Sequence, residues 1–100
     1  MALRGAMSAW RKLITANVRE LRFHFSQTSQ GSKGLRDFVQ SNYKELKTAN
    51  PTFPFLVREC EGVEAKVWAR YDFGVEKSLS VEGMDATKVE KSVQQLVTEK

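Results

Sequence analysis

Two reactive side chains occur once each in this sequence: His24 and Cys60. A histidine could act as a general acid or base, and a cysteine could act as a nucleophile or a redox thiol. His24 has no catalytic partner visible in the sequence, so we expect an exposed or helix-covered residue. Cys60 follows an apolar run near Arg58, which could stabilise a thiolate, although a small residue buried at a strand end is more frequent. One cysteine excludes an internal disulfide and a cysteine-built zinc site, and we predict no catalytic, cofactor-binding or metal-binding residues.

A glycine-containing segment, residues 31–34, precedes a predicted helix. It lacks the glycine spacing of phosphate-binding loops and of dinucleotide-binding turns. The N-terminus of the helix, flanked by Lys33 and Arg36, could hold an anion, but a solvated first turn is the ordinary explanation.

The most distinctive feature is Trp68-Ala69-Arg70-Tyr71, in which an arginine lies between two large aromatic residues. Tryptophan, tyrosine and arginine are enriched among the residues that dominate protein interfaces. In a strand, Ala69 and Tyr71 face the core, while Trp68 and Arg70 point to the other face. A helix could cover Trp68, but a charged strand residue needs solvent or a partner. We predict a partner interface with four candidate residues: Arg58, Trp68, Arg70 and Tyr71.

The elements that must position these residues begin with a strand over residues 18–25, in which apolar and polar residues alternate. A helix follows, with Ser32 as its N-cap and with an apolar stripe that comprises Leu35, Phe38, Val39, Tyr43 and Leu46. It ends at Asn50-Pro51, and residues 55–57 form a second, buried strand. A strand, a helix and a second strand make a right-handed βαβ unit, so these two strands should be parallel.

The second half of the chain predicts two more strands and a helix. The third strand spans residues 67–73, with its odd-numbered residues up to Phe73 on the core face. A turn at residues 72–75 joins it to a strand over residues 77–81, and Asp85 can cap a last helix. The predicted fold is α/β, with the order β-α-β-β-β-α, a mixed four-stranded sheet and two helices packed on it.

Charge is distributed unevenly over the 100 residues, whose formal net charge is +4. Four basic residues precede the first acidic residue, Glu20, and the rest of the chain is balanced. Residues 1–17 form a basic amphipathic segment typical of mitochondrial targeting, although a surface helix or a basic tail has the same pattern. We therefore divide the chain into this segment and a domain over residues 18–100. No run approaches the roughly 18 apolar residues of a membrane span.

Several segments resemble one family, the thioredoxin-like accessory subunits of mitochondrial respiratory complex I (NADH:ubiquinone oxidoreductase, alpha-subcomplex subunit 2). The resemblance covers residues 18–97 and rests above all on Arg58-Glu59-Cys60 and on Trp68-Ala69-Arg70-Tyr71. It implies a thioredoxin-like fold and a non-catalytic subunit of the matrix arm that supports assembly or stability. It also implies a location on the matrix side of the mitochondrial inner membrane, no cofactor, and partners among matrix-arm subunits, in particular the large iron–sulfur subunit. Nucleic acid, a membrane span and a homo-oligomer are not expected.

The chain departs from the family pattern at two positions. Many members carry a cysteine at the end of the first strand that can pair with the one matching Cys60, and this position is Ser26 here. Cys60 is therefore unpaired, and a redox switch is put in doubt. The position of the thioredoxin cis-proline is Ala65, where we expect a trans peptide because a non-proline cis bond costs about 3 kcal/mol.

Two other function classes fit parts of the sequence. A mitochondrial ribosomal protein of the related thioredoxin-like family would bind rRNA, and a basic chain suits RNA. Against it, acidic residues are interspersed among the lysines and arginines. A thiol-disulfide oxidoreductase needs a second cysteine, and Ser26 stands where an attacking thiol would be.

Overall fold

A computed structural model describes residues 9–98. Its strands are β1 (Glu20–Phe25), β2 (Phe55–Glu59), β3 (Lys66–Arg70) and β4 (Glu76–Ser80). Its helices are α2 (Ile14–Asn17), α3 (Lys33–Ala49) and α4 (Ala86–Thr98). Short 3₁₀ segments precede α2 (η1, Ala9–Leu13), precede α3 (η2, Gln30–Ser32) and join β3 to β4 (η3, Asp72–Gly74).

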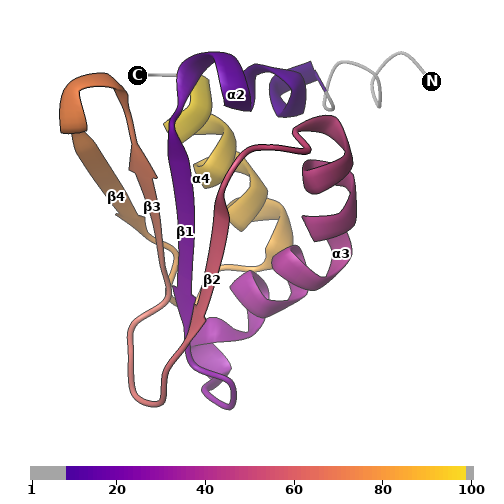
Figure 1. Ribbon diagram of the computed structural model, residues 1–100. Coiled ribbons are helices and arrows are strands. Elements are labelled where there is room, and N and C mark those ends of the chain that lie inside the picture. The colour runs from indigo at the N-terminus through magenta and orange to yellow at the C-terminus, as the bar shows by residue number, and fades with distance from the viewer. Residues whose placement is uncertain (1–8, 99–100) are drawn as a thin grey trace.

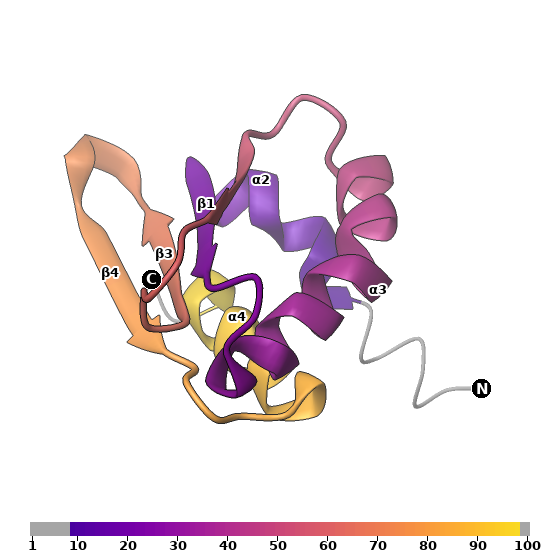
Figure 2. The same cartoon turned by 90° about the horizontal axis from the view of Figure 1, so that it is seen from below.

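The four strands form one mixed sheet in the order β2-β1-β3-β4. β1 is parallel to β2 and antiparallel to β3, and β3 is antiparallel to β4. The α3 connection between two parallel strands is the predicted βαβ unit, and the predicted α/β fold is confirmed. Helices α3 and α4 lie on the same face of the sheet (Figures 1 and 2). The opposite face carries no helix from the described part of the chain, and we call it the open face.

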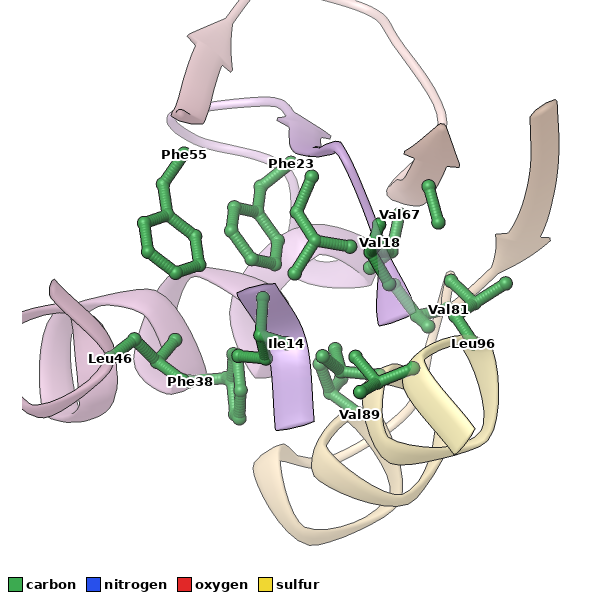
Figure 3. Packing of buried hydrophobic residues seen from close by; sticks show 14 of the residues in the cluster. Ile14, Val18, Phe23, Phe38, Leu46, Phe55, Val67, Val81, Val89 and Leu96 are labelled. Atoms are coloured by element: carbon green, nitrogen blue, oxygen red, sulfur yellow. The ribbon is translucent and has the colours of Figure 1, made fainter. Parts of the chain in front are cut away.

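The core lies between the sheet and the helices, because apolar residues alternate along the strands and recur along the helices (Figure 3). Leu21, Phe23 and Phe25 of β1 are buried, while the residues between them are only partly covered. The ring of Phe23 packs against Phe38 of α3, with 6.3 Å between centroids. Burying each such side chain stabilises the fold by about 1.5–3 kcal/mol. At Gly34, a Cβ atom would collide with the backbone carbonyl of Met84, so α3 packs directly against the segment before α4.

The N-terminal segment packs onto this core as a third, short helical unit. Trp10 and Ile14 are buried among the core residues. The guanidinium of Arg11 donates to Asn42 at 2.7 Å and lies 3.5 Å from carboxylates on α3 and α4, those of Glu45 and Glu90. Residues 1–8 lie outside the described residues, and the targeting role assigned to residues 1–17 stays a prediction.

Two local predictions are wrong. The third strand ends at Arg70, not at residue 73, and Phe73 lies fully exposed in the β3–β4 turn instead of in the core. Ser32 precedes α3, but its hydroxyl accepts a hydrogen bond from the backbone N–H of Ser26 and does not cap the helix. The cap predicted for α4 is confirmed, since the Asp85 carboxylate accepts from the N–H of Lys88 at 2.9 Å.

Candidate interaction surface on the open face of the sheet

The open face is built from alternate residues of all four strands. The strand registers place Arg22 opposite Trp68, His24 opposite Arg58 and Lys66, and Arg70 opposite Glu76. The face therefore presents these side chains together: Glu20, Arg22, His24, Leu56, Arg58, Lys66, Trp68, Arg70, Glu76, Ser78 and Ser80. It is mostly polar and charged, with one large aromatic side chain on β3.

Trp68 lies near the middle of the open face, between β1 and β4. The Arg22 guanidinium is 5.5 Å from the centroid of its ring, and the His24 ring is 6.4 Å away. The indole is half-buried by these neighbours. No helix among residues 9–98 covers it, so the alternative of a helix-covered Trp68 is not what the structure shows. An aromatic ring supported by strand neighbours is a rigid contact surface for a partner.

Two of the arginines on this face share a carboxylate. Glu76 accepts from the Arg22 Nη2 at 2.7 Å and from the Arg70 Nε at 3.1 Å. Arg22 also lies 3.2 Å from the Glu20 carboxylate. Exposed ion pairs contribute at most about 1 kcal/mol each to stability, so this network orients the side chains more than it holds the sheet together.

A hollow of about 280 Å³ opens on this face near the C-terminal ends of β1 and β2. It is lined by Arg22, His24, Arg58, Cys60 and Val63. Arg58 forms no ion pair with any residue in the range 9–98. Partial burial, and then the positive charges of Arg22 and Arg58, lower the pKa of His24 below 6.5. The imidazole is therefore predominantly neutral near pH 7. The guanidinium of Arg58, which has no ion pair among residues 9–98, suits a carboxylate or another anionic group.

The structure brings together three of the four predicted interface residues. Arg58, Trp68 and Arg70 share the open face, as predicted for the latter two. Tyr71 does not join them, because it is buried on the helix side and its hydroxyl donates to the Leu96 carbonyl at 2.6 Å. Burial also raises the pKa of Tyr71. We correct the predicted surface accordingly and leave Tyr71 out of it.

Arg22 and His24 also belong to this surface, although they are not among the predicted interface residues. Alternation placed them on the polar side of the first strand, which is correct. Their position beside Trp68 and Arg58 depends on the pairing of β1 with β2 and β3, and on the register of each pair. A single sequence contains no direct signal for that register, so only the structure reveals the cluster.

Cys60 and Ser26 follow the ends of the neighbouring strands β2 and β1. The Cys60 N–H donates to the Phe25 carbonyl at 3.0 Å, which places the cysteine backbone beside Ser26. Ser26 is buried, and its hydroxyl accepts from the backbone N–H groups of Thr28 and Ser29. Cys60 is exposed, contrary to a small buried residue at a strand end. The Ser26 hydroxyl thus supports the loop that leads to α3.

The remaining candidate features add no chemistry to this surface. The Glu82 carboxylate lies against Gly31, so a protein carboxylate already adjoins the segment before α3. Within residues 9–98, histidine, cysteine and acidic side chains form no group of three that could hold a metal ion. None of the helices described is long and apolar enough to cross a membrane. The peptide bonds of the described residues, including that of Ala65, are trans.

Comparison with known proteins identifies the family. Residues 35–86 match the family model of the mitochondrial ribosomal protein L51 / S25 / CI-B8 domain. This domain is thioredoxin-like. The chain is 44% identical over 89 residues to NADH dehydrogenase (ubiquinone) 1 alpha subcomplex subunit 2 of Arabidopsis thaliana, covering 89% of this chain and 92% of the relative. The mouse (Mus musculus) protein of the same name is 46% identical over 83 residues, which is 83% of this chain and 84% of the relative.

A third relative is the NADH-ubiquinone oxidoreductase 10.5 kDa subunit of Neurospora crassa. It is 42% identical over 80 residues, covering 80% of this chain and 85% of the relative. The three alignments cover between 80% and 89% of this chain. The chain belongs to the alpha subcomplex subunit 2 family of NADH dehydrogenase (ubiquinone), within the L51 / S25 / CI-B8 domain family.

Proposed function

We propose that this chain is an accessory subunit of the matrix arm of mitochondrial respiratory complex I, where it supports assembly or stability during electron transfer from NADH to ubiquinone. The observation that carries the proposal is the 42–46% identity to complex I subunits over at least 80 residues. In this role the chain acts by binding, on the matrix side of the inner membrane, and contributes no catalytic residue of its own.

The open face is the surface that this role would use. It presents the indole of Trp68 beside the Arg22 guanidinium, and Arg70 in an ion pair with Glu76. It also contains the hollow in which Arg58 lies. Aromatic and arginine side chains at the centre of an interface contribute most of its affinity. The hollow would accept a carboxylate of the neighbouring subunit. We propose that this neighbour is a matrix-arm subunit, in the first place the large iron–sulfur subunit.

A mitochondrial ribosomal protein is the second candidate. The matching family description includes ribosomal proteins, and the two arginines of the hollow could also hold RNA phosphates. Against RNA binding, Arg22 and Arg70 are already paired with Glu76, and Lys66 lies 3.8 Å from the Glu64 carboxylate. A phosphate-binding surface would leave such charges available.

Fractionation of mitochondria distinguishes the two candidate functions. The cells lack their endogenous alpha subcomplex subunit 2 and express the full chain with a tag. We expect the tag to migrate on native gels with NADH dehydrogenase activity, and complex I activity to be restored. Co-sedimentation with mitochondrial ribosomes, without the tag in complex I, would overturn the proposal and favour the ribosomal function.

A further inference from the structure

The tip of the β3–β4 hairpin carries an aromatic side chain without any cover. Phe73 in η3 is 102% exposed, compared with 44% for Leu13, another exposed large apolar residue. Val75, two residues further on, is 52% exposed. The hairpin projects away from α3, and its tip lies at the edge of the molecule in both views (Figures 1 and 2).

The backbone of Phe73 has a conformation that its side chain disfavours. Its φ and ψ angles are 64° and 25°, and it is the one non-glycine residue with positive φ among residues 9–98. Bulky L-residues rarely adopt this region, whereas asparagine or glycine does so readily. The turn therefore does not need a phenylalanine, and the exposed ring gains nothing from burial. Strain held at an exposed position is a reason to look for a function.

Hydrogen bonds hold the backbone of the turn that carries Phe73. The Tyr71 N–H donates to the Val75 carbonyl at 2.7 Å and closes the turn. The Arg19 Nε donates to the Asp72 carboxylate at 2.7 Å, which ties the turn to the end of α2 and the start of β1. The Tyr71 hydroxyl ties the start of the turn to α4. A turn whose backbone is held in this way loses little backbone conformational entropy when a partner binds.

From these observations we infer that Phe73 is a docking anchor whose ring enters an apolar pocket of a neighbouring protein subunit. This inference rests on the proposed function as an accessory subunit, and it names a contact outside the predicted interface residues. Arg70 and Glu76 form the last paired position of β3 and β4 before the tip. A subunit seated on the open face would therefore reach the tip as well.

A protein pocket fits this tip better than a lipid surface. Residues 70–77 contain two basic and two acidic side chains and so have no net charge. Membrane-binding tips and helices combine apolar residues with a basic excess that attracts anionic headgroups.

The test uses the full chain in cells that lack their own subunit 2, with Phe73→Asn as the variant. Asparagine tolerates positive φ, so we expect the melting temperature of the isolated chain to stay the same or to rise. The share of the chain found in complex I should fall at least tenfold relative to the unaltered chain. Phe73→Trp should retain most of the incorporation, and Val57→Thr, a change of similar shape, serves as a matched control at another exposed apolar position outside residues 1–17.

The outcomes separate this inference from the proposed function. If the unaltered chain does not enter complex I, the proposed function fails. If the unaltered chain enters and Phe73→Asn enters equally well, the anchor is refuted while the proposed function stands. Sedimentation of the isolated chain with vesicles of phosphatidylcholine and cardiolipin, lost in Phe73→Asn, would replace the protein pocket with a lipid surface.

Discussion

At the scale of single residues, Arg58 and Arg70 differ in what surrounds them. Arg70 shares Glu76 with Arg22, so a partner would meet a charge that is already partly neutralised. Arg58 lies in the hollow with His24 and Cys60, and no carboxylate oxygen of the described residues lies within 4 Å of its guanidinium nitrogens. The guanidinium of Arg58 is therefore the charge on the open face most available to a partner carboxylate.

We predict that Arg58→Glu lowers the affinity for the partner subunit about 10- to 100-fold, because it places two carboxylates in one hollow. Incorporation into complex I, measured on native gels in cells lacking their own subunit 2, checks this prediction. Lys91→Glu, with the same charge change at an exposed position of α4, should incorporate normally. Equal losses for both variants would show that net charge, not the hollow, controls docking.

His24 gives a pH-dependent prediction. Burial and the charges of Arg22 and Arg58 lower its pKa from 6.5, so the folded chain binds this proton less readily than the unfolded chain. The contribution of His24 to the free energy of unfolding is therefore fully present above pH 6.5. It is lost as the pH falls through the pKa that His24 has in the folded chain. His24→Gln should flatten this part of the pH profile of unfolding.

The chain contains one histidine, so its imidazole signal can be followed by NMR without ambiguity. Arg58→Gln should raise the pKa of His24 toward 6.5, because one nearby positive charge is removed. An unchanged titration curve in that variant would contradict the electrostatic contribution that we assign to Arg58.

At the scale of the elements, the N-terminal segment is held by a buried polar side chain at the end of α3. The Asn50 amide oxygen accepts from the backbone N–H and the hydroxyl of Thr15. Its NH₂ group donates to the carbonyls of Arg11 and Leu46. Asn50 is only 3% exposed, so losing this side chain would leave buried polar groups unsatisfied.

We predict that Asn50→Ala lowers the free energy of unfolding by about 2–4 kcal/mol, since several buried hydrogen bonds are lost together. Urea denaturation of the isolated full chain measures this loss. Thr48→Ala, an exposed substitution in the last turn of α3, should cost less than about 1 kcal/mol. If Asn50→Ala and Thr48→Ala lowered the free energy of unfolding equally, the hydrogen bonds of Asn50 to the N-terminal segment would contribute little to stability.

The predicted elements agree best with the structure where the apolar period is long. The stripe from Leu35 to Leu46 gives α3, and the alternation in residues 21–25 gives β1, both close to their observed bounds. The end of β3 was missed because Tyr71 and Phe73 continue the apolar alternation into the turn. Tyr71 is buried after the strand has ended, whereas Phe73 turns outward at positive φ. Local backbone geometry overrides alternation at this position.

At the scale of the whole molecule, one face of the sheet stays open because α3 and α4 both lie on the other face. The βαβ unit places α3 on one face, α4 returns to the same face, and the hairpin between them adds no cover to the other (Figure 1). The sequence predicted two helices packed on the sheet, with Trp68 and Arg70 on the face away from the core. The full cluster could not be predicted, because it depends on cross-strand registers.

In the proposed function, the open face of the sheet binds a matrix-arm subunit of complex I. Photo-crosslinking tests it most directly, with Trp68→p-benzoylphenylalanine in the full chain, in mitochondria of cells lacking their own subunit 2. Lys44→p-benzoylphenylalanine, on the exposed side of α3, serves as the control position. We predict that position 68 crosslinks to a matrix-arm subunit and that position 44 does not. Crosslinks from position 68 to ribosomal components, or to the matrix arm from position 44 alone, would contradict the claim.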